Sequence, residues 1–162
     1  MRTIVAGNWK MNTDRASAAA LIDALVRESA RFGAGAEAII APPFPFLAMA
    51  VEKCQGTPIR VAAQNCHQKE KGACTGEVSA AMLAEYGCRY VIVGHSERRA
   101  YHAESDQLVA DKAKDYVVTP GIRPVENRPS DDQKRVVTVE QAFADGANYI
   151  VGMAMSLFFL MG

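Results

Sequence analysis

Residues 3–11 read TIVAGNWKM, a short β-branched run that ends in a polar group, and residues 90–99 (YVIVGHSERR) have the same layout. In α/β proteins, the side chains that carry out chemistry lie at the carboxyl ends of parallel strands. The two stretches therefore predict that Asn8, Lys10 and His95 converge at one edge of a parallel sheet. An ammonium, an amide and an imidazole at such an edge would bind a small polar substrate of negative charge.

The rest of the chain repeats this strand-then-helix layout. Short hydrophobic runs alternate with longer segments of helical period, which is the pattern of βαβ units in a parallel sheet. Six units fit into the 162 residues, whereas a closed eight-stranded (β/α) barrel typically needs ~250 residues. We therefore expect a single α/β domain with about six of the usual eight units and an incomplete barrel. The expected strands are residues 3–6, 38–41, 59–63, 90–93, 116–119 and 149–151, and the expected helices are residues 15–32, 46–54, 79–86, 105–114 and 139–144.

Composition excludes several classes of protein. Lys plus Arg and Asp plus Glu both number 18, and no basic stripe indicates nucleic-acid binding. The four cysteines form no C-x-x-C pair and have no histidine spacing that suits a metal, so we expect reduced thiols, no metal and a cytoplasmic protein. The apolar tail at residues 153–161 is far shorter than the ~20 residues of a membrane span. We expect no signal peptide and no membrane anchor.

Asn8 and Lys10 form the first candidate pair. Residues two apart on a strand point to the same side, so both side chains could face the barrel interior. A lysine ammonium there would hold an anionic oxygen and stabilise enolate charge as it develops. The alternative is a solvated lysine after an edge strand, and the pair alone does not decide between the two.

His95 is the second candidate, because it follows Gly94 and precedes a plausible helix start at Ser96. The positive end of a helix dipole favours a neutral imidazole, which can donate a proton. The alternative is an isolated histidine in a loop. Glu97, taken alone, has the pattern of an ordinary first-turn carboxylate.

The spelling A-G-N-W-K-M-N together with G-H-S-E-R-R resembles triosephosphate isomerase over about residues 1–114. The resemblance implies a TIM-barrel fold and the interconversion of dihydroxyacetone phosphate and glyceraldehyde 3-phosphate through an enediolate, with no cofactor and no metal. It assigns substrate binding to Asn8 and Lys10. It makes His95 the group that polarises the substrate carbonyl and moves protons between its two oxygens, with Lys10 and Glu97 as the other catalytic residues.

The resemblance also implies a dimer. Residues 72–77 resemble the loop by which subunits of that family enter each other's active-site rim, with Thr75 as the contacting residue. The alternative for this segment is a plain surface turn. Open sheet edges, with unpaired N–H and C=O groups, independently favour a homodimer or other self-association, as does the atypical apolar tail of residues 153–162.

The catalytic base of that family lies on the sixth strand in a segment that resembles Tyr-Glu-Pro-Val-Trp, and this sequence has no such segment. A positioned general base supplies about 10²–10⁴-fold in rate. We therefore expect an impaired isomerase.

Residues 115–152 resemble a different enzyme, the last two units of orotidine 5′-phosphate decarboxylase, through VTPGIRP at residues 118–124. That resemblance makes Gln133 a ligand of the substrate phosphate. The decarboxylase's Asp-x-Lys-x-x-Asp set is missing, and residues 111–115 (DKAKD), which have the wrong spacing, are interpreted as a solvated helix face. The sequence thus predicts a chimaera or a truncated chain. Its alternative functions are those of a decarboxylase-like enzyme and of a non-catalytic phosphate-binding or assembly module.

Overall fold

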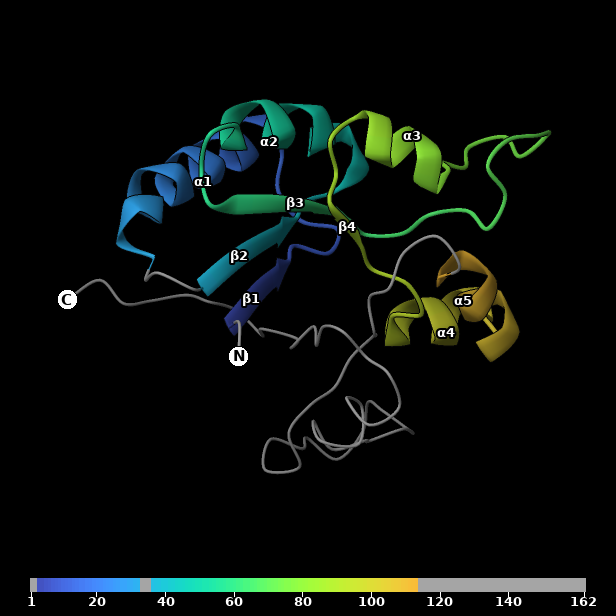
Figure 1. Cartoon of the computed structure of the whole chain (residues 1–162). Coiled ribbons are helices and arrows are strands. Elements are labelled where there is room, and N and C mark those ends of the chain that lie inside the picture. The colour runs from blue at the N-terminus through green and yellow to red at the C-terminus, as the bar shows by residue number, and fades with distance from the viewer. Residues whose placement is uncertain (1–2, 33–35, 114–162) are drawn as a thin grey trace.

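The computed structural model describes residues 3–32 and 36–113 (Figure 1). These residues contain a four-stranded parallel sheet in which the strands lie in chain order, β1-β2-β3-β4. This arrangement is half of a (β/α) barrel, and it confirms the expected α/β class with an incomplete TIM-barrel-like sheet. The expected strands at residues 116–119 and 149–151 lie outside the described residues. The strands are β1 (Thr3–Asn8), β2 (Ala36–Ala41), β3 (Ile59–Ala63) and β4 (Tyr90–Val91).

Helices connect the strands along the chain, α4 and α5 follow β4, and Figure 1 shows α1, α2 and α3 along one face of the sheet. The first helix begins where predicted because Asp14 caps it. The Asp14 carboxylate accepts a hydrogen bond from the Ser17 N–H at 2.8 Å, and the Asp14 N–H donates to the Ser17 hydroxyl at 3.0 Å. The helical elements are α1 (Arg15–Glu28), η1 (Ser29–Arg31), η2 (Phe44–Phe46), α2 (Leu47–Cys54), α3 (Ala80–Glu85), α4 (Ser96–His102) and α5 (Asp106–Ala113).

Several boundaries differ from the sequence-based expectation. Strand β1 continues two residues further than expected, to Asn8, because Asn8 still pairs with Ala41. The β4 ladder ends at Val91 rather than at residue 93. The helix expected over residues 15–32 changes from α to 3₁₀ geometry at Ser29, whose hydroxyl donates to the Val26 carbonyl at 2.7 Å.

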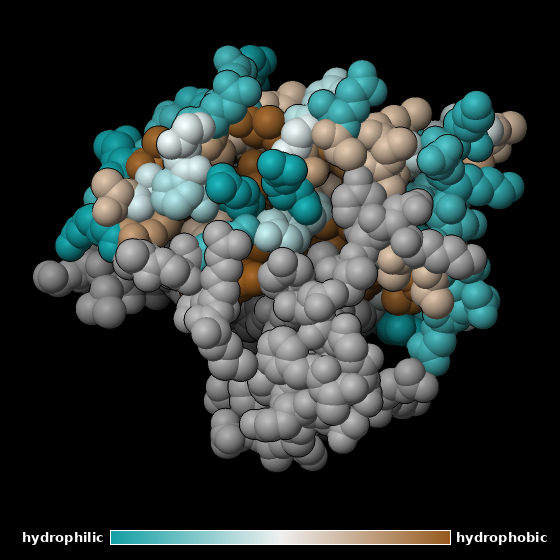
Figure 2. All heavy atoms as spheres, in the orientation of Figure 1, coloured by the Kyte–Doolittle hydropathy of each residue, from teal (hydrophilic) through white to brown (hydrophobic). Residues whose placement is uncertain are grey.

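Apolar side chains are buried on both faces of the sheet, as expected of parallel strands. Alternation along β2 directs Ile40 toward the helices and Ile39 toward the opposite face. Figure 2 shows hydrophilic residues around much of the described surface, with hydrophobic residues visible between them. Among the described residues, no helix has both the length and the apolar character of a membrane span. The helix-side cluster includes Ile22, Leu47, Val61 and Val93, and the opposite cluster contains Ile39, Ala41, Ala62 and Ile92.

Candidate active site

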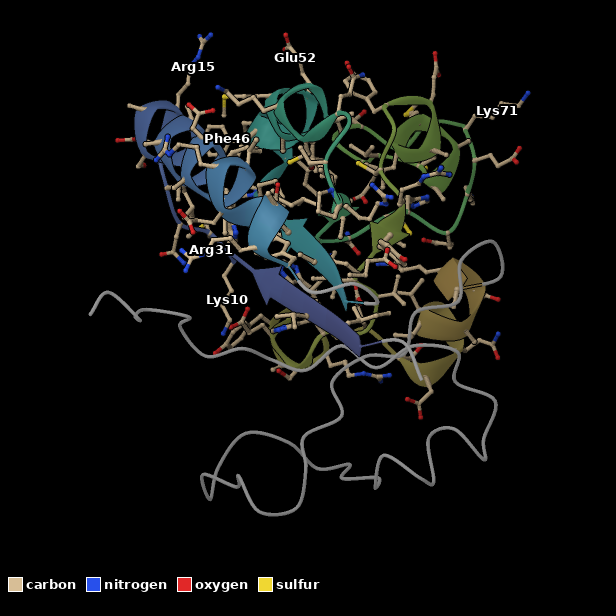
Figure 3. The ribbon with its side chains drawn as sticks, turned by 60° about the vertical axis from the view of Figure 1, so that its left-hand side comes forward. Lys10, Arg15, Arg31, Phe46, Glu52 and Lys71 are labelled. Atoms are coloured by element: carbon tan, nitrogen blue, oxygen red, sulfur yellow. The ribbon has the colours of Figure 1, made fainter. Side chains whose placement is uncertain are left out.

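Lys10 lies just beyond the carboxyl end of β1, where the chain has already left the strand (Figure 3). Its backbone is left-handed, with φ of 54°, which is uncommon for a residue other than glycine. The Asn8 Oδ1 atom accepts a hydrogen bond from the Lys10 N–H at 2.9 Å. The expectation that strand alternation places both side chains on one side was therefore wrong in its reason, because a turn positions Lys10 and the Asn8 side chain supports that turn.

Gln64 holds the other end of the Lys10 peptide. It follows β3 directly, and its Nε2 atom donates to the Lys10 carbonyl at 2.8 Å and to the Ala41 carbonyl at 2.8 Å. This amide thus connects the loop after β1 to the carboxyl ends of β2 and β3. No sequence motif assigns a function to Gln64.

The Lys10 ammonium contacts the first turn of α4. Its Nζ lies 2.6 Å from Oε1 of Glu97, and the Glu97 Oε2 lies 3.6 Å from Nδ1 of His95. The structure therefore brings Lys10, Glu97 and His95 together at the carboxyl edge of the sheet. Both members of the Lys10–Glu97 pair have side chains that are 41% exposed, so solvent and small molecules reach the pair.

His95 is the N-cap of α4, as the sequence predicted. Its Nδ1 accepts a hydrogen bond from the Glu97 N–H at 3.2 Å. An imidazole that accepts at Nδ1 is neutral and carries its proton on Nε2. The hydrogen bond thus favours a neutral imidazole at the start of α4, in the same turn as Glu97, the partner of Lys10.

The loop before His95 requires glycine. Gly94 has φ of +63°, and a Cβ atom at this position would lie 2.8 Å from Cγ1 of Val109 in α5. Arg99 donates from Nε to the Gly94 carbonyl at 3.1 Å. Contacts from both α4 and α5 therefore hold the loop that carries His95.

A second, buried ionic cluster lies behind α4. The Glu104 Oε1 atom accepts from Lys112 Nζ at 2.6 Å and from Arg98 Nε at 2.6 Å, and Lys112 Nζ also donates to Asn65 Oδ1 at 2.8 Å. The Lys112 and Glu104 side chains are 4% and 2% exposed. The interpretation of residues 111–115 as a solvated helix face was therefore wrong for Lys112, because an acidic and an amide partner from outside its helix draw it into the interior. Burial raises the pKa of the Glu104 carboxyl, but the hydrogen bonds from Lys112 and Arg98 outweigh burial and hold that pKa below its ordinary value.

Two predicted site residues remain to be placed, Thr75 and Gln133. Thr75 is on an exposed loop between β3 and α3, which projects from the body of the structure in Figure 1. Gln133 lies outside the described residues.

The cysteines are unsuited to metal binding where the structure describes them. Within residues 3–32 and 36–113, no cluster of three or more His, Cys, Asp or Glu side chains could hold a metal ion. Burial raises the pKa of the Cys54 and Cys88 thiols, which disfavours the thiolate that a metal requires.

Comparison with known proteins identifies the family of this chain. The profile of the family described as triosephosphate isomerase matches residues 3–126. The chain belongs to the triosephosphate isomerase family. The match includes residues 115–126, which were expected from the sequence to belong to a decarboxylase-like segment rather than to this family.

Curated relatives carry the same family name. The triosephosphate isomerase of Bordetella pertussis (strain Tohama I) is 51% identical over 122 residues, which cover 75% of this chain and 48% of the relative. The triosephosphate isomerase of Azoarcus sp. (strain BH72) is 48% identical over the same length and coverage. That of Nitrosococcus oceani is 50% identical over 114 residues, or 70% of this chain and 45% of the relative. The chain thus spans about half the length of the curated relatives it matches.

Proposed function

We propose that this chain carries the Lys10–Glu97–His95 part of an isomerase site that interconverts dihydroxyacetone phosphate and glyceraldehyde 3-phosphate through an enediolate. The observation that carries the proposal is the contact between Lys10 and Glu97 at 2.6 Å, next to a histidine whose Nδ1 accepts a hydrogen bond from the Glu97 N–H. Membership of the family supports the same assignment.

Each residue has a role that its geometry permits. The Lys10 ammonium attracts the anionic substrate and stabilises negative charge on the enediolate oxygens. The Nε2–H of His95 donates to the substrate carbonyl and transfers protons between the two oxygens. Glu97 holds Lys10 in place until the substrate competes for it, and Asn8 supports the Lys10 turn and contributes to substrate binding.

The 162-residue sequence has no Tyr-Glu-Pro-Val-Trp segment for the base that removes the substrate proton. We therefore expect a polypeptide of this sequence to bind dihydroxyacetone phosphate but to turn it over slowly. A measured turnover within tenfold of ~10²–10³ s⁻¹, a typical upper range for enzymes, would contradict the proposed impairment.

A binding measurement tests the site itself. Titration calorimetry with dihydroxyacetone phosphate should show binding by the unmodified chain and a loss of at least about tenfold in affinity for Lys10→Met. The matched control is Lys53→Met, because Lys53 forms a similar ion pair with Asp23, 2.7 Å long, between α2 and α1. Equal affinities for all three proteins would overturn the proposed role of Lys10.

We infer that the partner is a second copy of this chain, in a cytoplasmic homodimer that the Thr75 loop helps to form. Large apolar side chains exposed on the described surface support an interface, since water disfavours them. Light scattering checks this inference, and a monomer of 17.5 kDa would contradict it. The exposed apolar residues include Met11, Met82, Tyr86 and Tyr101.

The decarboxylase resemblance and the role of Gln133 in binding phosphate stay predictions. So does the division of a single domain over residues 1–162 into an isomerase-like part (1–114), a decarboxylase-like part (115–152) and an apolar tail (153–162). Titration calorimetry with orotidine 5′-phosphate tests the decarboxylase resemblance. Binding that Gln133→Ala abolishes would favour the decarboxylase-like or phosphate-binding alternative.

A further inference from the structure

Gln64 makes two hydrogen bonds from one nitrogen atom. Its Nε2 donates both protons, one to the Lys10 carbonyl and one to the Ala41 carbonyl, each at 2.8 Å. The Ala41 carbonyl also accepts from the Trp9 N–H at 3.1 Å. Gln64 therefore fastens the turn after β1 to the adjacent strand at the position where Lys10 leaves the sheet.

The Lys10 backbone requires such support. A left-handed conformation is sterically unfavourable for a side chain such as lysine and persists only where surrounding contacts impose it. Two hydrogen bonds act on the Lys10 backbone, whose φ is positive. Its N–H donates to the side-chain Oδ1 of Asn8 at 2.9 Å, and its C=O accepts from Nε2 of Gln64. The left-handed turn then directs the ammonium toward Glu97, 2.6 Å away.

We propose that Gln64 is a positioning residue that acts through Lys10: it keeps the Lys10 backbone left-handed and thereby keeps the ammonium at the site. The effect of Gln64 on the Lys10 backbone follows from the geometry alone, whereas the effect on substrate binding rests on the proposed function. Glutamine suits the position because its amide nitrogen supplies two donors to two carbonyls. Methionine has a similar length but supplies neither donor.

The first experiment measures the backbone of Lys10 without any ligand. In ¹³C- and ¹⁵N-labelled protein, Gln64→Met should shift the Cα, C′ and amide resonances of Lys10, which report its backbone angles, and should speed hydrogen exchange at the Lys10 amide. Gln55→Met is the matched control, because Gln55 is an exposed glutamine at the end of α2. Unchanged Lys10 resonances in Gln64→Met would overturn the proposal. If Gln64→Met does not fold, Gln64→Asn serves instead, since its shorter amide cannot span both carbonyls, and the same criterion applies.

The second experiment measures the affinity for dihydroxyacetone phosphate in a double-mutant cycle. Gln64→Met should weaken binding roughly tenfold in the unmodified chain and should have almost no effect in the Lys10→Met background, because Gln64 acts through Lys10. An equal loss in both backgrounds would overturn the proposal. A chain that binds no dihydroxyacetone phosphate at all would overturn the proposed function instead, and the resonances of Lys10 would still decide the role of Gln64.

Discussion

Two lysine–glutamate pairs with the same 2.6 Å separation flank α4. Glu97 in its first turn pairs with Lys10, and Glu104, just beyond its end, pairs with Lys112. Both members of the first pair are 41% exposed, whereas Lys112 and Glu104 are 4% and 2% exposed. The two pairs have the same separation, so the main difference between them is their access to water.

Solvent decides what each pair can do. An exposed ion pair contributes about 0–1 kcal/mol to stability, so Lys10 can leave Glu97 for another anionic oxygen at little cost. A buried pair cannot separate without leaving an uncompensated charge in a medium of low polarity. The Lys10 pair is therefore suited to binding, and the Lys112 pair to joining α5 to the carboxyl end of β3 through Asn65.

The largest effect should come from removing the buried lysine. Lys112→Met should lower the free energy of unfolding by about 3 kcal/mol, toward the lower end of the range for breaking a buried pair, because Arg98 still contacts Glu104. Urea unfolding measures this change. Adding Glu104→Gln to Lys112→Met should recover part of the loss, since a neutral amide needs no counter-charge. A loss as small as that of Lys10→Met would contradict the comparison.

Acid should weaken the buried cluster next. The pKa of Glu104 is lower in the folded chain than the ordinary value of 4.5 that it has when unfolded. Its contribution to stability is therefore complete above that ordinary value and is lost as the pH falls through the lower, folded pKa. Urea unfolding between about pH 6 and pH 3 should show a steeper decline for the unmodified chain than for Glu104→Gln. Parallel pH profiles would contradict this assignment, and Glu97→Gln serves as the exposed control.

A smaller effect is expected at the residue between the two pairs. Ala103 ends α4 in a left-handed conformation, with φ of 53°. Ala103→Gly should raise the free energy of unfolding by about 1 kcal/mol, because glycine adopts this conformation without the steric cost of a Cβ atom. The control is Ala110→Gly in the exposed face of α5, which should lower stability by about the same amount. The same sign at both positions would contradict the expectation.

The smallest effect should belong to the exposed pair. Lys10→Met should change the free energy of unfolding by less than about 1 kcal/mol. That change should be smaller still in about 0.5 M salt, because ions screen exposed charges. Unfolding at low and high salt checks this. A salt-independent loss of several kcal/mol would show that the Lys10 pair is structural after all.

Much of the fold follows from local patterns in the sequence. The hydrophobic run at residues 59–63 is strand β3 with the predicted bounds, and α3 lies within the range of residues 79–86 predicted for a helix, with Ser79 as its N-cap. The gathering of Lys10 and His95 at one edge also follows, because the ends of consecutive parallel strands meet there. In these places, local preference and the final fold agree.

The features that were missed depend on contacts between distant parts of the chain. Nothing in the type of residue marks Lys10 as left-handed, because the hydrogen bonds that impose this conformation come partly from Gln64, on another unit. Lys112 has the charge pattern of an exposed helix position, yet Asn65 and Glu104 bury it. A sequence pattern reports the structural preference of a segment. The conformation of Lys10 and the burial of Lys112 are instead determined by hydrogen-bond partners from other parts of the chain.

The order of the strands also has a consequence for the time course of folding. Each strand pairs with its neighbour in the sequence across a single helical connection, so the sheet described above can be assembled one unit after another as a chain is synthesised. The contact between Lys10 and Glu97 spans 87 positions and joins the first unit to the last one described. The scaffold of the site can therefore form early, while the ion pair at its centre is among the last contacts to close.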